Sequence, residues 1–231
     1  MNELLVICPS RSRPKMLSEM VESFVATSRI SALVVLVDND DPDCLENIKI
    51  IKSAGGDCDY VLGKRDTTTN LINNAFSYFA PHKFYSTTND DFKYLTHGWD
   101  VILTEEIKRN GKVGIAYGND LLQGKQIPST SVISREIVSA LGWLQLPTLT
   151  HLYGDSVWQY IGRSANCLHY RPDVIIEHKH YFSKKVPADD TFLRTNSSAM
   201  YNRDNRAFCD WIANQASADV QKVKGLLNGA A

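Results

Sequence analysis

The stretch LLVICPSRSRP, residues 4 to 14, sets the fold of the chain. Its first five residues form an unbroken apolar run, which is typical of a strand buried on both faces of a sheet. Pro14 then opens a segment in which Met16 and Met20 recur at helical spacing, and proline is well accommodated in a first helical turn. The stretch therefore predicts a strand, a loop with two arginines and a helix.

The same succession repeats along the first part of the chain. Further strands are predicted over residues 32–38, 59–63 and 83–88, with helices from Pro42 to the following Gly-Gly pair and over residues 69–80. Parallel strands need such crossover helices between them, so the alternation predicts an α/β fold with a mostly parallel central sheet flanked by helices. Ligands of these sheets bind beyond the carboxyl ends of the strands, which makes the loop residues there the candidate functional residues.

The alternation weakens in the second part, where we predict one continuing domain. A polar stretch from Ser183 to Ser198 is a candidate mobile lid before a C-terminal helix. The remaining predicted elements are helices over residues 98–110 and 135–143 and after Asp155, and strands over residues 112–118, 129–134 and 173–180.

Composition narrows the class of protein. Of the 231 residues 43% are hydrophobic and 22% charged, with a net charge of -1, which argues against a broadly cationic nucleic-acid surface. Five scattered cysteines fit neither a disulfide framework nor a cysteine zinc site, so a reducing cytoplasm is expected. The chain shows neither a basic leader nor an apolar run of about 18 residues, and we expect no membrane span.

Charged residues follow the first three predicted strands. Arg11 and Arg13 precede a helix amino terminus, where guanidinium and backbone N–H groups favour an anionic or planar ligand; a solvated loop is the alternative. Asp38 ends the second strand, where an acid binds a ribose or base edge or else caps a helix. Arg65 brings a further cation to this edge, or lies in an ordinary charged loop. The glycines of a P-loop or a dinucleotide-binding loop are missing.

The fourth strand runs into TTNDDF, residues 87 to 92. Adjacent carboxylates at Asp90 and Asp91 repel each other unless water, hydrogen bonds or a cation compensates, so the stretch is either a turn or a metal-phosphate site. Mg²⁺ and Mn²⁺ are commonly held by one or two carboxylates plus substrate phosphate oxygens. His178 and His180 alternate along the last strand and face the same side, either as metal ligands or as a structural pair.

An ordered set of stretches carries a family resemblance: LLVICPSRSRP, LVVLVDNDDPD, TTNDDF with GWD, YGDSVW, IIEHKH and RDNRAFCDW. The set resembles the GT-A glycosyltransferases, which use nucleotide sugars, and in particular small family-2-like members often encoded by bacteriophages. It covers most of the chain. The resemblance implies a single GT-A-like (Rossmann-like) domain over residues 1–231, with a nucleotide-binding half at about 1–92, an acceptor and catalytic half at about 93–199 and a C-terminal helix at about 200–228.

The resemblance also implies a donor site and a metal site. Asp91, with His178 or His180, stands where the family holds Mn²⁺ or Mg²⁺ against the donor diphosphate. Asn89 departs from the family, which commonly has a carboxylate at this position. An amide can bind a ribose hydroxyl, but it adds no charge for a metal. The implied nucleotide-sugar site consists of Pro9, Ser10, Arg11, Arg13, Asp38, Arg65, Asn89 and Asp90.

Asp155 begins a predicted helix, where a carboxylate is stabilised as a cap. The resemblance implies another role, since Asp155 matches the family's catalytic aspartate, which in inverting members takes the acceptor hydroxyl proton. Trp99 and Tyr153 are the expected acceptor contacts because sugars and bases stack on aromatic faces, whereas Trp158 on a helix is expected in the core. The chemistry agrees with this, since a cation stabilises the leaving diphosphate and a carboxylate deprotonates the attacking alcohol.

The predicted activity is metal-dependent transfer of a sugar to a hydroxyl acceptor, with uridine diphosphate sugars as the favoured donors. A modified DNA base, a protein and a glycan are the open acceptor classes. The alternatives are a nucleotidyltransferase, which lacks its usual Gly-rich, lysine-bearing first loop here, and a non-catalytic nucleotide- or sugar-binding module. The sequence carries no signal for the oligomeric state.

Overall fold

The computed structural model describes residues 2–79, 81–179, 181 and 189–229. The strands are β1 (Leu4–Ser10), β2 (Ser31–Asp38), β3 (Cys58–Gly63), β4 (Phe84–Thr87), β5 (Phe92–Tyr94), β6 (Ile115–Asn119), β7 (Ser131–Ser134) and β8 (Leu168–His178). The helices are α1 (Pro14–Thr27), α2 (Cys44–Ala54), α3 (Thr68–Phe79), α4 (Trp99–Arg109), α5 (Arg135–Leu141), α6 (Gly154–Ser164), α7 (Asp190–Thr195), α8 (Ser198–Asn214) and α9 (Ala216–Gly229).

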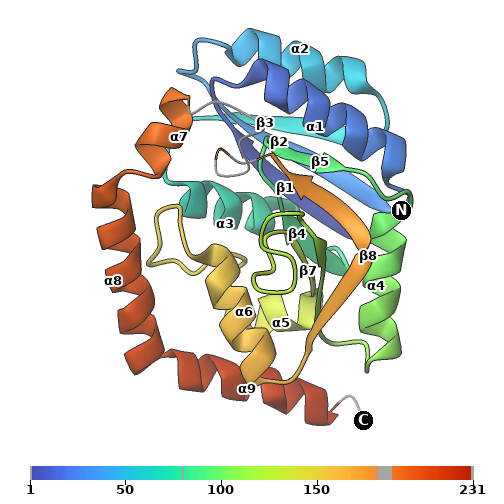
Figure 1. Ribbon diagram of the computed structural model, residues 1–231, viewed down its shortest axis with the longest axis vertical. Helices are drawn as coiled ribbons and strands as arrows, with labels where there is room; N and C mark the ends of the chain where they lie inside the picture. The colour runs from blue at the N-terminus through green and yellow to red at the C-terminus, as the bar shows by residue number, and fades with distance from the viewer. Residues whose placement is uncertain (1, 80, 180, 182–188, 230–231) are drawn as a thin grey trace.

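Within these residues the strands form one eight-stranded sheet in the order β3-β2-β1-β4-β7-β6-β8-β5 (Figure 1). Strands β3, β2, β1 and β4 run parallel, and β6 runs parallel to β8. Helices cover both faces of this sheet. The predicted α/β fold with a mostly parallel, helix-flanked sheet is confirmed.

Strand β1 lies at the centre of the parallel half because its side chains are apolar on both faces. Leu4 and Val6 point to the layer with α1, α2 and α4, whereas Leu5 and Ile7 point to the layer that contains α3, α5, α6, α8 and α9. All four are at most 1% exposed. The unbroken apolar run is thus divided between two cores by the period of a strand.

The second half of the sheet is mixed. Strand β7 is antiparallel to both β4 and β6. The connection from β6 to β7 contains no helix, and a crossover helix is what consecutive strands usually need to run parallel. Strand β8 begins at Leu168 and not at the predicted residue 173, since its first part pairs with β6. The short β5, which pattern reading did not find, lies antiparallel to the end of β8.

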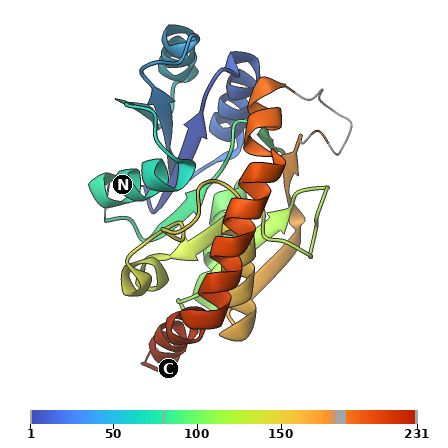
Figure 2. The same ribbon diagram turned by 90° about the vertical axis from the view of Figure 1, so that its left-hand side faces the viewer.

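The C-terminal segment consists of two helices where one was predicted. Helix α8 runs lengthwise along one side of the molecule, and α9 turns off at its end, as Figures 1 and 2 show. The break follows Gln215, whose backbone N–H bonds the carbonyl oxygen of Trp211 at 2.9 Å. Trp211 is 2% exposed, and its indole N–H donates to Asp219 of α9 at 3.0 Å. The tryptophan thereby holds the two helices together at their corner.

The candidate lid, Ser183 to Ser198, falls partly outside the described residues. Its described part contains α7, which begins after the capping residue Asp189. Among the described residues, every helix is too short or too polar to cross a bilayer.

Candidate functional site

A cleft of about 750 Å³ opens at the carboxyl ends of the strands. Its walls come from the loops after β1, β3 and β4, from the ends of β2 and β8, from the start of α6 and from α7. The sequence-predicted residues that line it are Pro9, Ser10, Arg11, Arg13, Asp38, Arg65, Asn89, Asp90, Asp91, Tyr153, Asp155 and His178.

The arginine loop after β1 has a fixed shape. Ser12 takes a left-handed backbone conformation with φ of 56°, which is uncommon for a residue with a side chain. Asp41 compensates by accepting hydrogen bonds from the Ser12 backbone N–H and hydroxyl, both at 2.9 Å. Because Ser12 is turned in this way, Arg11 and Arg13 reach two different groups of carboxylates.

Arg11 contacts the end of β2. Its Nη1 lies 3.0 Å from Asp38 and 2.6 Å from Asp40. Burial raises the pKa of Asp38 although the Arg11 ion pair opposes the shift, whereas the hydrogen bond from Arg11 lowers the pKa of the exposed Asp40. The nucleotide-binding residues predicted at two strand ends therefore form one charged unit.

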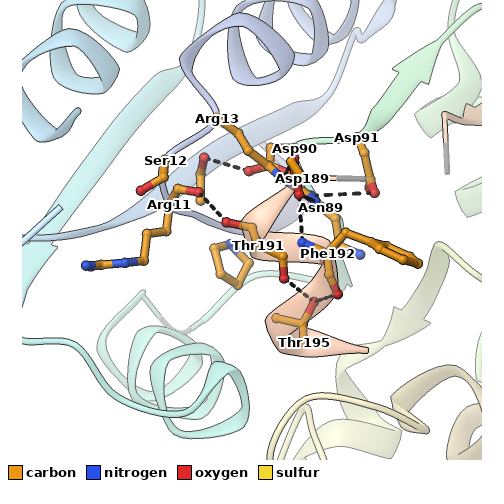
Figure 3. A network of polar contacts seen from close by, with 12 residues as sticks. Arg11, Ser12, Arg13, Asn89, Asp90, Asp91, Asp189, Thr191, Phe192 and Thr195 are labelled. Atoms are coloured by element: carbon orange, nitrogen blue, oxygen red, sulfur yellow. Dashed lines mark hydrogen bonds and ion pairs between the residues drawn. The ribbon is translucent and has the colours of Figure 1, made fainter. Parts of the chain in front are cut away.

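Arg13 reaches the acidic turn after β4 (Figure 3). Its Nη1 lies 3.2 Å from Asp90, whose other carboxylate oxygen accepts from the Ser10 hydroxyl at 2.8 Å. Burial raises the pKa of Asp90 to about 6, against the opposing effect of Arg13. Asp90 thus joins the first loop to the fourth strand.

The neighbouring Asp91 meets the last strand. Its Oδ1 lies 3.4 Å from His178 Nε2, and the two side chains are 10% and 15% exposed. The His178 ring stacks on Phe92, with ring centres 4.2 Å apart. Pairing of Phe92 in β5 with His178 in β8 places the carboxylate and the imidazole side by side.

Asp155 is the second residue of α6 and is partly buried at the cleft wall. Burial raises its pKa, and hydrogen bonds from the Ser156 backbone and hydroxyl only partly oppose the shift. Tyr153 precedes the helix with φ of 68° and stacks on Phe208, with ring centres 5.3 Å apart. A carboxylate with a raised pKa at a cleft wall is suited to accepting a proton.

The loop before α6 is held from behind by α8. The fully buried carboxylate of Asp204 accepts the backbone N–H groups of Thr150, His151 and Leu152 at 3.0, 2.8 and 2.8 Å. The ring of His151 lines the cleft, and its Nδ1 lies 2.8 Å from the Thr68 hydroxyl. The C-terminal extension therefore sets the position of the segment that carries Asp155.

Comparison with known proteins identifies the fold. No protein-family model and no curated protein sequence matches the chain. A mannosyltransferase from Pyrobaculum calidifontis, solved with GDP-Man and Mn²⁺, superposes with a TM-score of 0.60 at 11% identity, covering 99% of this chain and 74% of that one. Residues 1–349 of S. aureus TarS in complex with UDP superpose with a TM-score of 0.60 at 11% identity, covering 100% of this chain and 83% of that one. The same TarS residues in complex with UDP-GlcNAc superpose with a TM-score of 0.57 at 11% identity, covering 100% of this chain and 81% of that one. The chain has the GT-A fold.

One acceptor residue predicted for this fold is wrong. Trp99 is 0% exposed, because it begins α4 and packs against Phe24 and Tyr94 in the core behind the cleft. Trp158 is 2% exposed, as expected for a core residue, although part of it reaches the cleft wall. His180 lies outside the described residues.

The cleft of this GT-A fold also contains residues that sequence reasoning missed. Arg194 lines it from α7, and His151 lines it from the loop held by α8. Asp189, the cap of α7, contacts the lining residue Arg13. The sequence signal for Asp189 was its place as a helix cap before a short apolar stretch. Arg194 and His151 had no local signal, because their positions depend on contacts far along the chain.

A closed metal site is not present among the described side chains: no three His, Cys, Asp or Glu residues gather there to enclose an ion. Asp91 and His178 nevertheless offer one oxygen and one nitrogen ligand at the cleft wall. This donor set fits an open site that substrate oxygens complete, and the nitrogen favours Mn²⁺ over Mg²⁺.

Proposed function

We propose that this protein transfers a sugar from a nucleoside diphosphate sugar to a hydroxyl acceptor. The observation that carries the proposal is the gathering of Asp155, Asp91 and His178 on one cleft with arginines from separate strand ends. The likeness of fold to proteins solved with GDP-Man, UDP and UDP-GlcNAc agrees with it.

Each group has a proposed role. The loop from Pro9 to Arg13, with Asp38 and Arg65, binds the nucleotide, and Asn89 bonds a ribose hydroxyl. Asp91 and His178 hold Mn²⁺, which when bound neutralises charge on the diphosphate. Tyr153 contacts the acceptor.

The proposed reaction is a single inverting displacement. The acceptor oxygen attacks the anomeric carbon while the bond from that carbon to the phosphate oxygen breaks, and the electron pair leaves with the nucleoside diphosphate. Asp155 takes the acceptor proton as the attack proceeds. Burial raises its pKa, which makes it a stronger base than an ordinary aspartate.

The proposed substrates are classes of donor and acceptor. A uridine diphosphate sugar is the preferred donor, and the acceptor is a modified DNA base, a protein or a glycan. The balanced net charge of -1 argues against extensive duplex binding, so a DNA base would have to be presented out of the duplex. The proposed compartment is the cytoplasm.

Thermal unfolding with ligand panels tests the proposal. We expect UDP, GDP or one of their sugars to raise the melting temperature with Mn²⁺ and less with chelator, because a ligand at 100 times its Kd stabilises the native state by about 2.7 kcal/mol. The stabilising donor is then incubated with acceptor pools, and free nucleoside diphosphate is measured. Release of pyrophosphate from a triphosphate would instead indicate a nucleotidyltransferase, and binding without any turnover would indicate a binding module.

A further inference from the structure

Helix α7 lies over the arginine loop although it buries none of its own residues. Figure 3 shows it directly beside Arg11, Ser12 and Arg13. The Thr191 hydroxyl lies 3.4 Å from the backbone oxygen of Arg11, and the capping residue Asp189 contacts Arg13. A helix with no buried apolar face depends on such polar contacts for its position.

The contact of Asp189 with Arg13 is a two-pronged ion pair. Nε and Nη2 of Arg13 each lie 2.7 Å from one carboxylate oxygen of Asp189, while Nη1 points to Asp90. The Arg13 side chain is 12% exposed and that of Asp189 is 37% exposed. Parallel hydrogen bonds of this kind fix direction as well as distance. Asp189 also accepts a hydrogen bond from the Phe192 backbone N–H at 2.7 Å, so one carboxylate both caps the helix and attaches it to the arginine loop.

The helix carries a cation into the cleft. Arg194 lines the cleft together with Arg11 and Arg65, which come from the loops after β1 and β3. Desolvation in the cleft, followed by repulsion from these arginines, lowers the pKa of Arg194. The Arg13–Asp189 pair therefore has to hold Arg194 against like charges, and an anion bound among them would relieve the repulsion.

We infer that Asp189 is a positioning residue that attaches α7 to Arg13 and thereby places Arg194 on the diphosphate of the donor. The inference rests on the proposed function, since the diphosphate is the charged part of a nucleotide sugar. Because the ion pair and the bound diphosphate both favour the same position of α7, each strengthens the other.

The test is a double-mutant cycle on nucleotide binding. The probes are UDP and GDP, each with Mn²⁺, titrated by calorimetry into the full chain; the one that binds the wild type more tightly is used throughout. The variants are Asp189→Asn, Arg194→Ala and the two combined. Asparagine is chosen because it still caps a helix but has no charge for the ion pair. Asp190→Asn, an exposed acid one residue further along the same helix, is the matched control.

We expect Asp189→Asn and Arg194→Ala each to weaken binding about five- to tenfold, as for lost charge-assisted hydrogen bonds. In the Arg194→Ala background the effect of Asp189→Asn falls to within about twofold, because both act through the same side chain. Where turnover is measurable, KM for the donor rises and kcat changes little. An undiminished effect of Asp189→Asn when residue 194 is alanine overturns the inference, as does wild-type affinity in Asp189→Asn.

A measurement without ligand separates this inference from the proposed function. Hydrogen exchange of the α7 amides is compared in the wild type, Asp189→Asn and Asp190→Asn. We expect faster exchange in Asp189→Asn alone, and unchanged exchange refutes the attachment of α7. If neither nucleotide binds the wild type under any metal condition, the proposed function fails whatever the exchange result.

Discussion

Aspartates that are largely shielded from water occur both outside the cleft and within it, and the two groups differ in their partners. Asp100 and Asp204 are 0% exposed, and each accepts hydrogen bonds from a run of neighbouring residues in another segment. In the cleft, Asp90 contacts an arginine and a serine, and Asp155 accepts hydrogen bonds from its own neighbour Ser156. Burial raises the pKa of both cleft aspartates.

The comparison separates two uses of the same side chain. A buried carboxylate that accepts several backbone N–H groups is compensated by the fold and anchors a loop. A carboxylate whose pKa is raised has less compensation from the fold and remains available to a proton or a ligand. We therefore expect substitutions of the aspartates outside the cleft to cost stability and of those within it to cost activity.

The largest effect is expected at Asp155. Asp155→Asn should lower turnover by about 10²- to 10⁴-fold, because the amide cannot take the acceptor proton, while donor affinity stays near that of the wild type. Initial rates of nucleoside diphosphate release and calorimetric donor titration measure the two quantities. Asp210→Asn, on the exposed side of α8, is the control and should leave both unchanged. Full turnover in Asp155→Asn would reject this residue as the base.

At Asp204 the expected loss is in stability. Asp204→Ala leaves three backbone N–H groups of residues 150–152 without their acceptor and should lower the free energy of unfolding by roughly 3 to 5 kcal/mol. Urea unfolding followed by circular dichroism provides the measurement. Asp210→Ala on the same helix should change it by no more than about 0.5 kcal/mol. Equal stabilities for the two variants would contradict the anchoring role.

Asp91 should show a metal-dependent effect. Asp91→Ala removes one proposed Mn²⁺ ligand and should weaken Mn²⁺-supported donor binding by at least about tenfold, with little effect when chelator is present. Calorimetry with and without Mn²⁺ compares the variant with the wild type. If donor affinity is the same with and without metal in both proteins, Asp91 does not hold a cation.

The smallest expected effect is a pH dependence of stability at His151. Burial lowers the pKa of this imidazole below its ordinary 6.5, so the unfolded chain binds the proton more readily than the folded chain. Above pH 6.5 the neutral imidazole predominates in both the folded and the unfolded chain, and its burial costs no stability. As the pH falls from 6.5 through the folded pKa, the unfolded chain takes up the proton first and the folded state loses stability.

The change between pH 7.5 and 5.5 should be smaller in His151→Gln than in the wild type, by up to about 1 kcal/mol. Glutamine keeps a hydrogen-bonding partner for the Thr68 hydroxyl. Urea unfolding at the two pH values, in both proteins, isolates the histidine from the other titrating groups. Identical pH dependences would show that His151 binds protons equally in the folded and unfolded chain.

Local sequence pattern was sufficient to predict the parallel strands and the helices between them. The apolar run from Leu4 and the helix from Pro14 are where periodicity predicted them, because buried parallel strands and amphipathic helices have distinct repeats. The same reasoning placed Asp38, Asp91 and Asp155 at the ends of elements that open on one edge of the sheet, and the structure brings all three to the cleft.

Pattern failed where pairing or burial depends on distant partners. Trp99 follows a glycine in a polar context, and only the packing of α4 onto Phe24 shows that it is a core residue. The three-residue β5 is too short for a period to be read, and it exists because β8 offers it an edge.

The sequence by itself determined the α/β class, the edge of the sheet where ligands would bind and the chemical types of the side chains there, since these follow from strand and helix periods and from the order of elements. Tertiary structure alone decided which polar groups contact one another. These contacts are those of Arg13 with Asp189, of His178 with Asp91, and of Asp204 with the backbone of the loop before α6. The first of these pairs is separated by 176 residues of chain. Such contacts arise from the packing of whole elements, and no local repeat in the sequence encodes them.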